Sequence, residues 1–280
     1  MSSELSVRTD DGLSLFVRTD GLQHGNAPLV CLPGLTRNSR DFTQVAARYS
    51  PHRFVVRMDF RGRGGSSFDP TAQSYTPDRY VRDAILVLDA LGIGAAVLLG
   101  TSLGGSIAML TASLHPARVA GVILNDVGPK LEPAGFARIQ SYAGKLPTNG
   151  TWAEAVAQLR SLAGAVAPLI TDRTWERLVR EQYREFAPGD IRPDHDPRIV
   201  GGMASVDPQN IATTWPLFAA LAAIPTLVLR GERSDLFSAD TLDEMRRRKP
   251  DLVAVTVADR GHCPLLDEPE SLAAVDTFLA

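Results

Sequence analysis

The sequence predicts an α/β fold, in which a mostly parallel, doubly wound sheet carries helices on both faces and is interrupted by a helical insertion. Short apolar runs alternate with helical patterns up to residue 130 and again from residue 222. Residues 131–221 contain helical patterns and almost no strand signal. A chain of 280 residues is long enough for one large domain with such an insertion. We therefore expect residues 1–130 and 222–280 to form one α/β domain around an insertion at 131–221.

The strand predictions begin with a β-hairpin. Two runs, 5–9 and 13–19, flank Asp11-Gly12, which is a strong signal for a short turn. The later runs are continuously apolar, as is typical of strands that are buried on both faces of a parallel sheet. They cover residues 29–32, 54–56, 96–99, 119–124, 225–229 and 252–257.

Helical patterns lie between these runs. Thr76 is a capping residue followed by proline, and it starts a helix that we expect to continue to Leu91. The other predicted helices outside the insertion cover 38–49, 239–248 and the chain from about Glu270. Those within the insertion cover 152–162, 174–186 and 215–221. This alternation of strand and helix predicts the doubly wound sheet.

The composition limits the classes of partner. The formal net charge of −3 argues against nucleic acid as the main partner, because phosphate binding favours a basic face. No signal peptide is recognisable at the N-terminus, and no apolar run reaches 18 residues, so we expect no membrane partner. Two cysteines, Cys31 and Cys263, cannot make a disulfide framework. We expect two reduced thiols in a cytoplasmic protein.

The central motif is Gly100-Thr101-Ser102-Leu103-Gly104, a G-x-S-x-G pattern. It directly follows a predicted strand and directly precedes a helical stretch. A strand-to-helix elbow requires glycines because the backbone turns sharply, and it leaves the serine hydroxyl exposed. This context makes Ser102 the candidate nucleophile.

A serine hydroxyl needs a base, and the chain offers five histidines. His24 and His52 lie in predicted loops, His115 lies at a predicted helix end, and His195 lies in the insertion. His262 alone closely follows a predicted strand, at the carboxyl edge of the sheet, where open α/β sheets place their sites. His262 is therefore the candidate general base.

The third group should be a carboxylate at the same edge, where it would keep the imidazole in the useful tautomer. Asp235 follows the strand that ends at Leu229 and gives the chain order Ser, Asp, His. We prefer Asp235 to the other carboxylates at this edge. Asp126 is an alternative acid, because it ends the strand 119–124, and Glu232 is a weaker third candidate.

Two backbone N–H groups are expected to bind the oxyanion. One belongs to Leu103, directly after the nucleophile, and the other lies in the loop after the strand 29–32. Pro33 has no N–H, and Gly34 lets the backbone turn, so Leu35 is the expected donor.

At these positions the chain resembles the α/β-hydrolase superfamily over nearly its whole length. The resemblance rests on residues 32–35 (Leu-Pro-Gly-Leu), 59–64 (Asp-Phe-Arg-Gly-Arg-Gly), 100–104, 231–235 and 261–262. It implies an eight-stranded sheet whose site is covered by a helical cap, as in carboxylesterases, enol-lactonases and C–C bond hydrolases. Many relatives have His-Gly where this chain has Leu-Pro-Gly, so a side chain that often supports the oxyanion loop is missing. A serine nucleophile, in place of aspartate, disfavours dehalogenase and epoxide hydrolase chemistry.

We therefore expect a serine hydrolase that cleaves a small carboxylic ester or lactone through an acyl-enzyme, with no cofactor and no metal. C–C bond cleavage by the same triad and a non-catalytic binding role are the alternatives. Arg37, Trp152 and Trp215 are possible substrate contacts, although Arg37 is better explained by a surface salt bridge. Asp194-His195-Asp196 suggests a metal cluster, but without further spaced ligands a solvated loop is the better interpretation.

Overall fold

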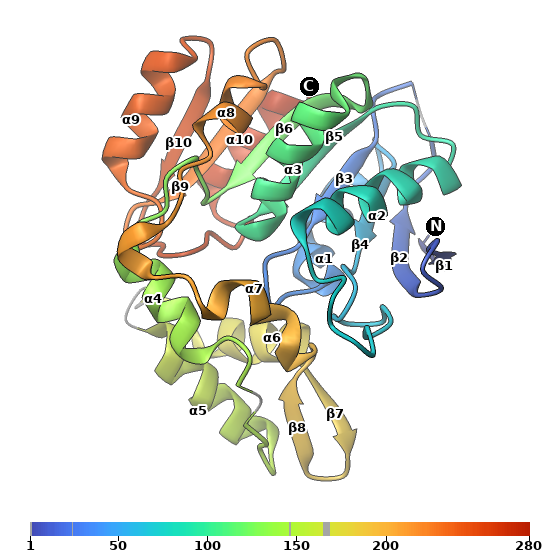
Figure 1. The fold of residues 1–280 in the computed structure, drawn as a ribbon, viewed down its shortest axis with the longest axis vertical. Coiled ribbons are helices and arrows are strands. Elements are labelled where there is room, and N and C mark those ends of the chain that lie inside the picture. The colour runs from blue at the N-terminus through green and yellow to red at the C-terminus, as the bar shows by residue number, and fades with distance from the viewer. Residues whose placement is uncertain (1, 24, 146, 165–168) are drawn as a thin grey trace.

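The computed structural model describes residues 2–23, 25–145, 147–164 and 169–280 and contains an eight-stranded sheet (Figure 1). In sheet order the strands are β1 (Ser2–Arg8), β2 (Ser14–Asp20), β4 (Val55–Met58), β3 (Leu29–Leu32), β5 (Ala96–Thr101), β6 (Val119–Asn125), β9 (Thr226–Gly231) and β10 (Val253–Val257). β1 and β2 are antiparallel, as are β2 and β4, and all other neighbours are parallel. The predicted fold class is confirmed.

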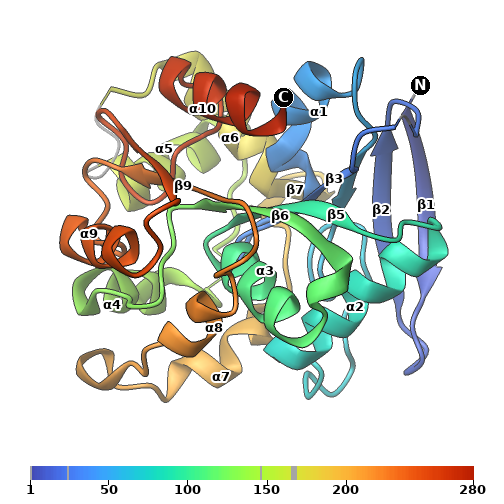
Figure 2. The same ribbon diagram turned by 90° about the horizontal axis from the view of Figure 1, so that it is seen from above.

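Helices cover both faces of the sheet (Figure 2). α1 (Thr43–Tyr49) and α10 (Pro269–Leu279) lie on one face, and α2 (Pro77–Ala90), α3 (Leu103–Leu114) and α8 (Trp215–Ala219) lie on the other. In β3, Leu29 and Cys31 pack in the apolar cluster that contains α1 and α10, whereas Val30 and Leu32 pack in the cluster that contains α2 and α3. The strand is thus buried on both faces, which explains its continuous apolar run.

We call residues 131–221 the β6–β9 segment, and its described residues add no strand to the large sheet. The segment contains α4 (Pro133–Tyr142), α5 (Trp152–Ala163), α6 (Asp172–Gln182), α7 (Gly201–Ala204) and α8. Figure 1 shows α4 to α7 together at one end of the molecule. α9 (Ala239–Arg248) belongs to the chain after the segment. Among the described helices, none is long and apolar enough to cross a membrane.

The predicted helix 174–186 is wrong in its last part. α6 ends at Gln182, and β7 (Tyr183–Ala187) then pairs antiparallel with β8 (Asp190–Pro193). The turn between them is Pro188-Gly189, and Gly189 has a φ of +74°, which glycine adopts without strain. This Pro-Gly dipeptide was the sequence signal for the hairpin.

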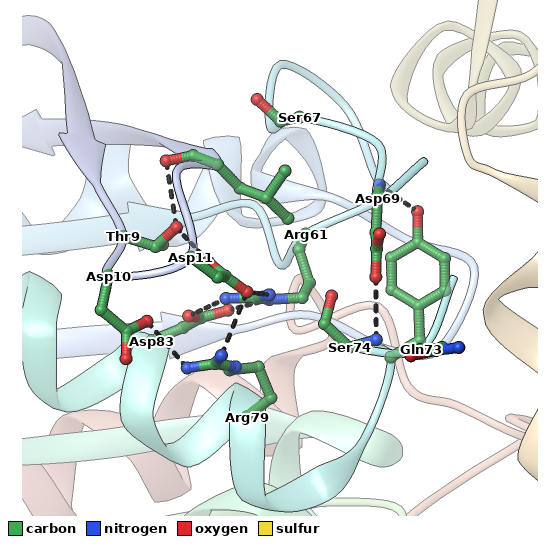
Figure 3. A network of polar contacts seen from close by, with 12 residues as sticks. Thr9, Asp10, Asp11, Arg61, Ser67, Asp69, Gln73, Ser74, Arg79 and Asp83 are labelled. Carbon is green, nitrogen blue, oxygen red and sulfur yellow. Dashed lines mark hydrogen bonds and ion pairs between the residues drawn. The ribbon is translucent and has the colours of Figure 1, made fainter. Parts of the chain in front are cut away.

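Arg61 joins the β1–β2 turn to α2 (Figure 3). Its fully buried guanidinium donates to Asp83 at 2.7 and 2.5 Å and to Asp11 at 2.6 Å. Burial alone would raise the pKa of Asp11, but hydrogen bonds from Arg61 and Thr9 lower it to about 2. These contacts fix the loop after β4, whose next arginine, Arg63, reaches the candidate site.

Candidate active site

Ser102 lies at the junction of β5 and α3 and has a φ of +52°, in the left-handed region that is unusual for a residue with a side chain. The turn is tight: a Cβ on Gly104 would lie 2.0 Å from the carbonyl oxygen of Leu32, and a Cβ on Gly100 would lie 2.3 Å from the backbone of Gly104. Only glycine permits such close approaches. The structure therefore contains the predicted elbow, with Ser102 at its apex.

His262 lies beside this serine, in the loop after β10. Its Nε2 is 2.9 Å from Oγ of Ser102, and its side chain is 8% exposed. The loop reaches this position because Gly231 has no side chain, since a Cβ there would lie 2.4 Å from the carbonyl oxygen of Gly261. Of the other histidines, His52 and His115 are exposed, and His24 lies outside the described residues.

The carboxylate beside His262 is that of Asp126 and not that of Asp235. Oδ2 of Asp126 is 2.7 Å from Nδ1 of His262 and accepts a hydrogen bond from Ser234 Oγ at 2.6 Å. Its Oδ1 accepts from the N–H of Gly231 at 2.8 Å, and the side chain is fully buried. The preference for Asp235 over Asp126 is therefore wrong as a statement about geometry.

Asp235 is held elsewhere by Arg138 of α4. The guanidinium donates two hydrogen bonds to the carboxylate, from Nε at 2.5 Å and from Nη2 at 2.8 Å. Burial alone would raise the pKa of Asp235, but the hydrogen bonds and charge of Arg138 outweigh it and lower the pKa. Asp235 thus connects the β6–β9 segment to the core, and the sequence held no signal for its partner.

The two expected oxyanion donors lie where the sequence placed them. Leu103 is the first residue of α3, and Leu35 lies in the loop after β3. Neither N–H donates to an acceptor among the described residues. Arg63 holds the Leu35 peptide by donating from Nε to its carbonyl oxygen at 2.8 Å. Arg63 therefore supports the loop in which the resemblance indicated a missing side chain, a role that the sequence analysis did not assign.

A cavity of about 440 Å³ opens above these groups. Its core wall includes Gly34, Leu35, Ser102 and His262, and the opposite wall comes from the β6–β9 segment. Its charged lining residues are Arg37, Arg138 and Lys145, and no aspartate or glutamate lies among the described lining residues. The cavity can thus hold a small organic molecule with its reacting group next to Ser102.

Comparison with known proteins agrees with this architecture. The model of the alpha/beta hydrolase family matches residues 29–275. The chain belongs to this family. A 3-hydroxybutyrate-oligomer hydrolase from Cupriavidus necator is 33% identical over 265 residues, which cover 89% of this α/β-hydrolase chain and 87% of the relative. A 2-(acetamidomethylene)succinate hydrolase from Mesorhizobium japonicum is 27% identical over 281 residues, and the match covers 98% of this chain and 95% of the relative.

The solved structures include an alpha/beta hydrolase from Novosphingobium aromaticivorans, with a TM-score of 0.94 and 39% identity. The match covers 99% of this chain and 98% of that one. Family and fold are therefore established together. The substrate of this α/β-hydrolase has to be inferred from its own cavity.

Of the three expected substrate contacts, only Arg37 lines the cavity of this α/β-hydrolase. It is paired with Asp41 at 2.6 Å, which agrees with the salt bridge that the sequence favoured. Trp152 packs in the apolar cluster of α5 and α6, with Arg180 stacked 3.7 Å from its ring centroid. Trp215 packs against the cluster of α2 and α3 under Arg248. Neither tryptophan lies among the described residues that line the cavity, so their contact with substrate stays a prediction that this cavity does not support.

His195 is buried, so the interpretation of residues 194–196 as a solvated loop is also wrong. Asp194 binds Arg40 and Arg184, whereas Asp196 binds Arg198 and Tyr75. His195, which separates these two aspartates in the sequence, is 4% exposed and lines the cavity. Among the described residues, no group of three or more metal-ligating side chains could hold an ion. Cys31 and Cys263 are both free thiols.

Proposed function

We propose that this α/β-hydrolase is a serine hydrolase that cleaves a carboxylic ester or lactone through an acyl-enzyme. Ser102 is the nucleophile, His262 the general base, and Asp126 the acid that orients the imidazole. The observation that carries the proposal is the hydrogen-bonded chain from Ser102 through His262 to Asp126, at 2.9 and 2.7 Å. The roles follow from this geometry, as in other serine hydrolases.

The reaction then has two halves. Ser102 Oγ attacks the ester carbonyl while Nε2 of His262 takes its proton, and the N–H groups of Leu35 and Leu103 stabilise the oxyanion. The C–O bond breaks, His262 gives the proton to the leaving alcohol, and the acyl group stays on Ser102. Water attacks the acyl-enzyme with His262 again as base, which releases the acid and restores the serine.

We infer further that the β6–β9 segment, residues 131–221, is a cap on an α/β core made of residues 1–130 and 222–280. The segment supplies one wall of the cavity and is held to the core by Arg138–Asp235 and Arg40–Asp194, at 2.5 and 2.8 Å. Such a cap separates the ester from bulk water, which strengthens the electrostatic interactions that stabilise the oxyanion.

The substrate of this proposal carries a carboxylate besides its ester. Arg37, Arg138 and Lys145 give the lining of the cavity a positive charge without an acidic lining residue in the described chain. The two arginines pair with Asp41 and Asp235, neither of which lines the cavity, whereas Lys145 is exposed. The names of the two relatives described above, a 3-hydroxybutyrate-oligomer hydrolase and a succinate-derivative hydrolase, agree with acidic substrates.

The first test replaces the nucleophile. For Ser102→Ala we expect kcat on p-nitrophenyl butyrate to fall by about 10⁴-fold or more, because the acyl-enzyme cannot form. A fluorophosphonate should label the unmodified protein and not the variant. Ser106→Ala, one turn along α3, is the matched control and should keep label and activity. Full activity of Ser102→Ala would refute the proposal, and turnover confined to vinylogous diketones would favour C–C bond cleavage.

The substrate class is tested with the dimer of 3-hydroxybutyrate and its methyl ester. We expect a larger kcat/KM for the free acid at low ionic strength, with a difference that shrinks as salt screens the cations. Equal values for the two compounds at every salt concentration would count against the carboxylate, but not against the triad.

A further inference from the structure

His195 is a buried polar side chain for which the proposed mechanism has no use. It is 4% exposed, and neither of its ring nitrogens has a hydrogen-bond partner within the described chain. An unpaired buried polar group costs free energy that a ligand can recover by pairing with it. His195 is also part of the wall of the cavity that contains Ser102 and His262. A molecule bound over Ser102 is thus the natural partner for its nitrogens.

The surroundings of His195 keep it free for such a partner. The flanking carboxylates turn to other groups: Asp194 accepts from Arg40 at 2.8 Å, and Asp196 accepts from Arg198 and Tyr75 at 2.6 and 2.7 Å. The backbone is fixed, since Asp194 O accepts from the N–H of Gly64 and Asp196 N–H donates to Gly62. The peptide on each side is therefore held, and the ring between them is not bound by either neighbour.

The charge state of His195 indicates what it can bind. Burial, together with the nearby guanidinium of Arg63, lowers the pKa of His195 to about 4. Arg63 is itself fully buried, and its Nη2 has no partner in the described chain. At neutral pH the ring is therefore uncharged, with one N–H donor and one acceptor nitrogen.

An acceptor nitrogen is satisfied only by a donor. An ester carbonyl or a carboxylate can only accept, so it would leave this nitrogen unpaired, whereas a hydroxyl group donates to it. The lining of the cavity that contains His195 also includes the apolar side chains of Leu159, Leu162 and Pro193. A hydroxyl on the substrate would thus be distinguished from a hydrogen at the same carbon.

We propose that His195 is a specificity-determining residue that accepts a hydrogen bond from a hydroxyl group on the acyl part of the substrate, so that the protein selects hydroxyacyl esters. This inference rests on the proposed esterase function and names its substrate class more narrowly. His195 takes no part in proton transfer at the ester and acts through binding alone.

The experiment compares ethyl 3-hydroxybutyrate, as each enantiomer, with ethyl butyrate, following acid release at pH 7.5. For the unmodified protein we expect kcat/KM to be about tenfold or more higher for one hydroxylated enantiomer, the value of one buried hydrogen bond. His195→Phe keeps a planar ring without nitrogens, and we expect the ratio of the two kcat/KM values to fall to near one. His195→Asn or His195→Gln should restore part of the ratio.

The ratio separates this inference from the esterase proposal. Hydrolysis of both esters with equal kcat/KM, or a preference that survives in His195→Phe, would overturn the role of His195 and leave the esterase intact. If neither ester is hydrolysed, calorimetry decides on His195 separately. Ser102→Ala should bind 3-hydroxybutyrate more tightly than butyrate, and Ser102→Ala/His195→Phe should not. Equal affinities in Ser102→Ala would overturn the inference.

Discussion

Asp126 is bound on both oxygens, which makes it a rigid support for an imidazole. It accepts from Gly231 N–H at 2.8 Å and from Ser234 Oγ at 2.6 Å, besides its contact with His262. Its φ of +56°, directly after β6, turns the chain at that point. Such strain in a residue with a side chain persists only where the surroundings hold it. Here contacts from the last residue of β9 and from the loops after β9 and β10 do so.

The two candidate acids can be separated by matched substitutions. For Asp126→Asn we expect kcat to fall by about 10⁴-fold, because an amide at this position favours the wrong tautomer of His262. Asp235→Asn should cost far less, since Asp235 binds Arg138 and does not touch the imidazole. Both proteins should show unchanged near-ultraviolet circular dichroism. Equal losses in kcat, or a larger loss for Asp235→Asn, would contradict the assignment of Asp126.

At the scale of elements, the elbow between β5 and α3 depends on how closely the helix approaches the sheet. Gly104, in the first turn of α3, lies against the backbone of β3 at Leu32. The same approach places the first N–H groups of α3 beside Ser102, where an oxyanion needs them.

Gly104→Ala tests this packing. Its Cβ would lie 2.0 Å from a backbone oxygen that cannot move aside like a side chain, so we expect the free energy of unfolding to fall by about 1–3 kcal/mol or more. The matched control is Gly94→Ala, whose Cβ would meet nothing within 4 Å and should change the free energy by less than about 0.5 kcal/mol. Urea denaturation measures both. Equal stabilities of the two variants would show that α3 can shift.

At the scale of the whole molecule, the proposed cap meets the rest of the chain through charged groups, one of which has a shifted pKa. Glu181 of α6 is buried close to Arg177 and to the core residue Asp41. Burial, and then the charge of Asp41, raise its pKa from 4.5 to about 7. The folded protein therefore binds a proton at Glu181 that the unfolded chain has released, between pH 4.5 and 7. Its contribution to stability falls as the pH rises through this window.

Glu181→Gln removes this titration and keeps a polar side chain at a site where Arg177 approaches to 3.3 Å. At pH 8 we expect the melting temperature of Glu181→Gln to exceed that of the unmodified protein by about 2–4 °C. A shift of this size corresponds to about 1 kcal/mol in the free energy of unfolding of a large domain. The difference should shrink towards pH 5, where the glutamate is protonated in the folded state. Calorimetry across this range measures it, and a difference independent of pH would exclude Glu181 as its source.

Local patterns in the sequence determined the strands of the large sheet, most helices, the elbow with Ser102 and the loop of His262, because period, capping and glycine placement act within a few residues. Tertiary structure decided between Asp126 and Asp235. Arg138, which is distant along the chain, binds Asp235, whereas Gly231 and Ser234 bind Asp126 beside His262. It also buried His195 and brought Arg63 to Leu35. These outcomes depend on contacts between residues that lie far apart in the sequence, and no local pattern encodes those contacts.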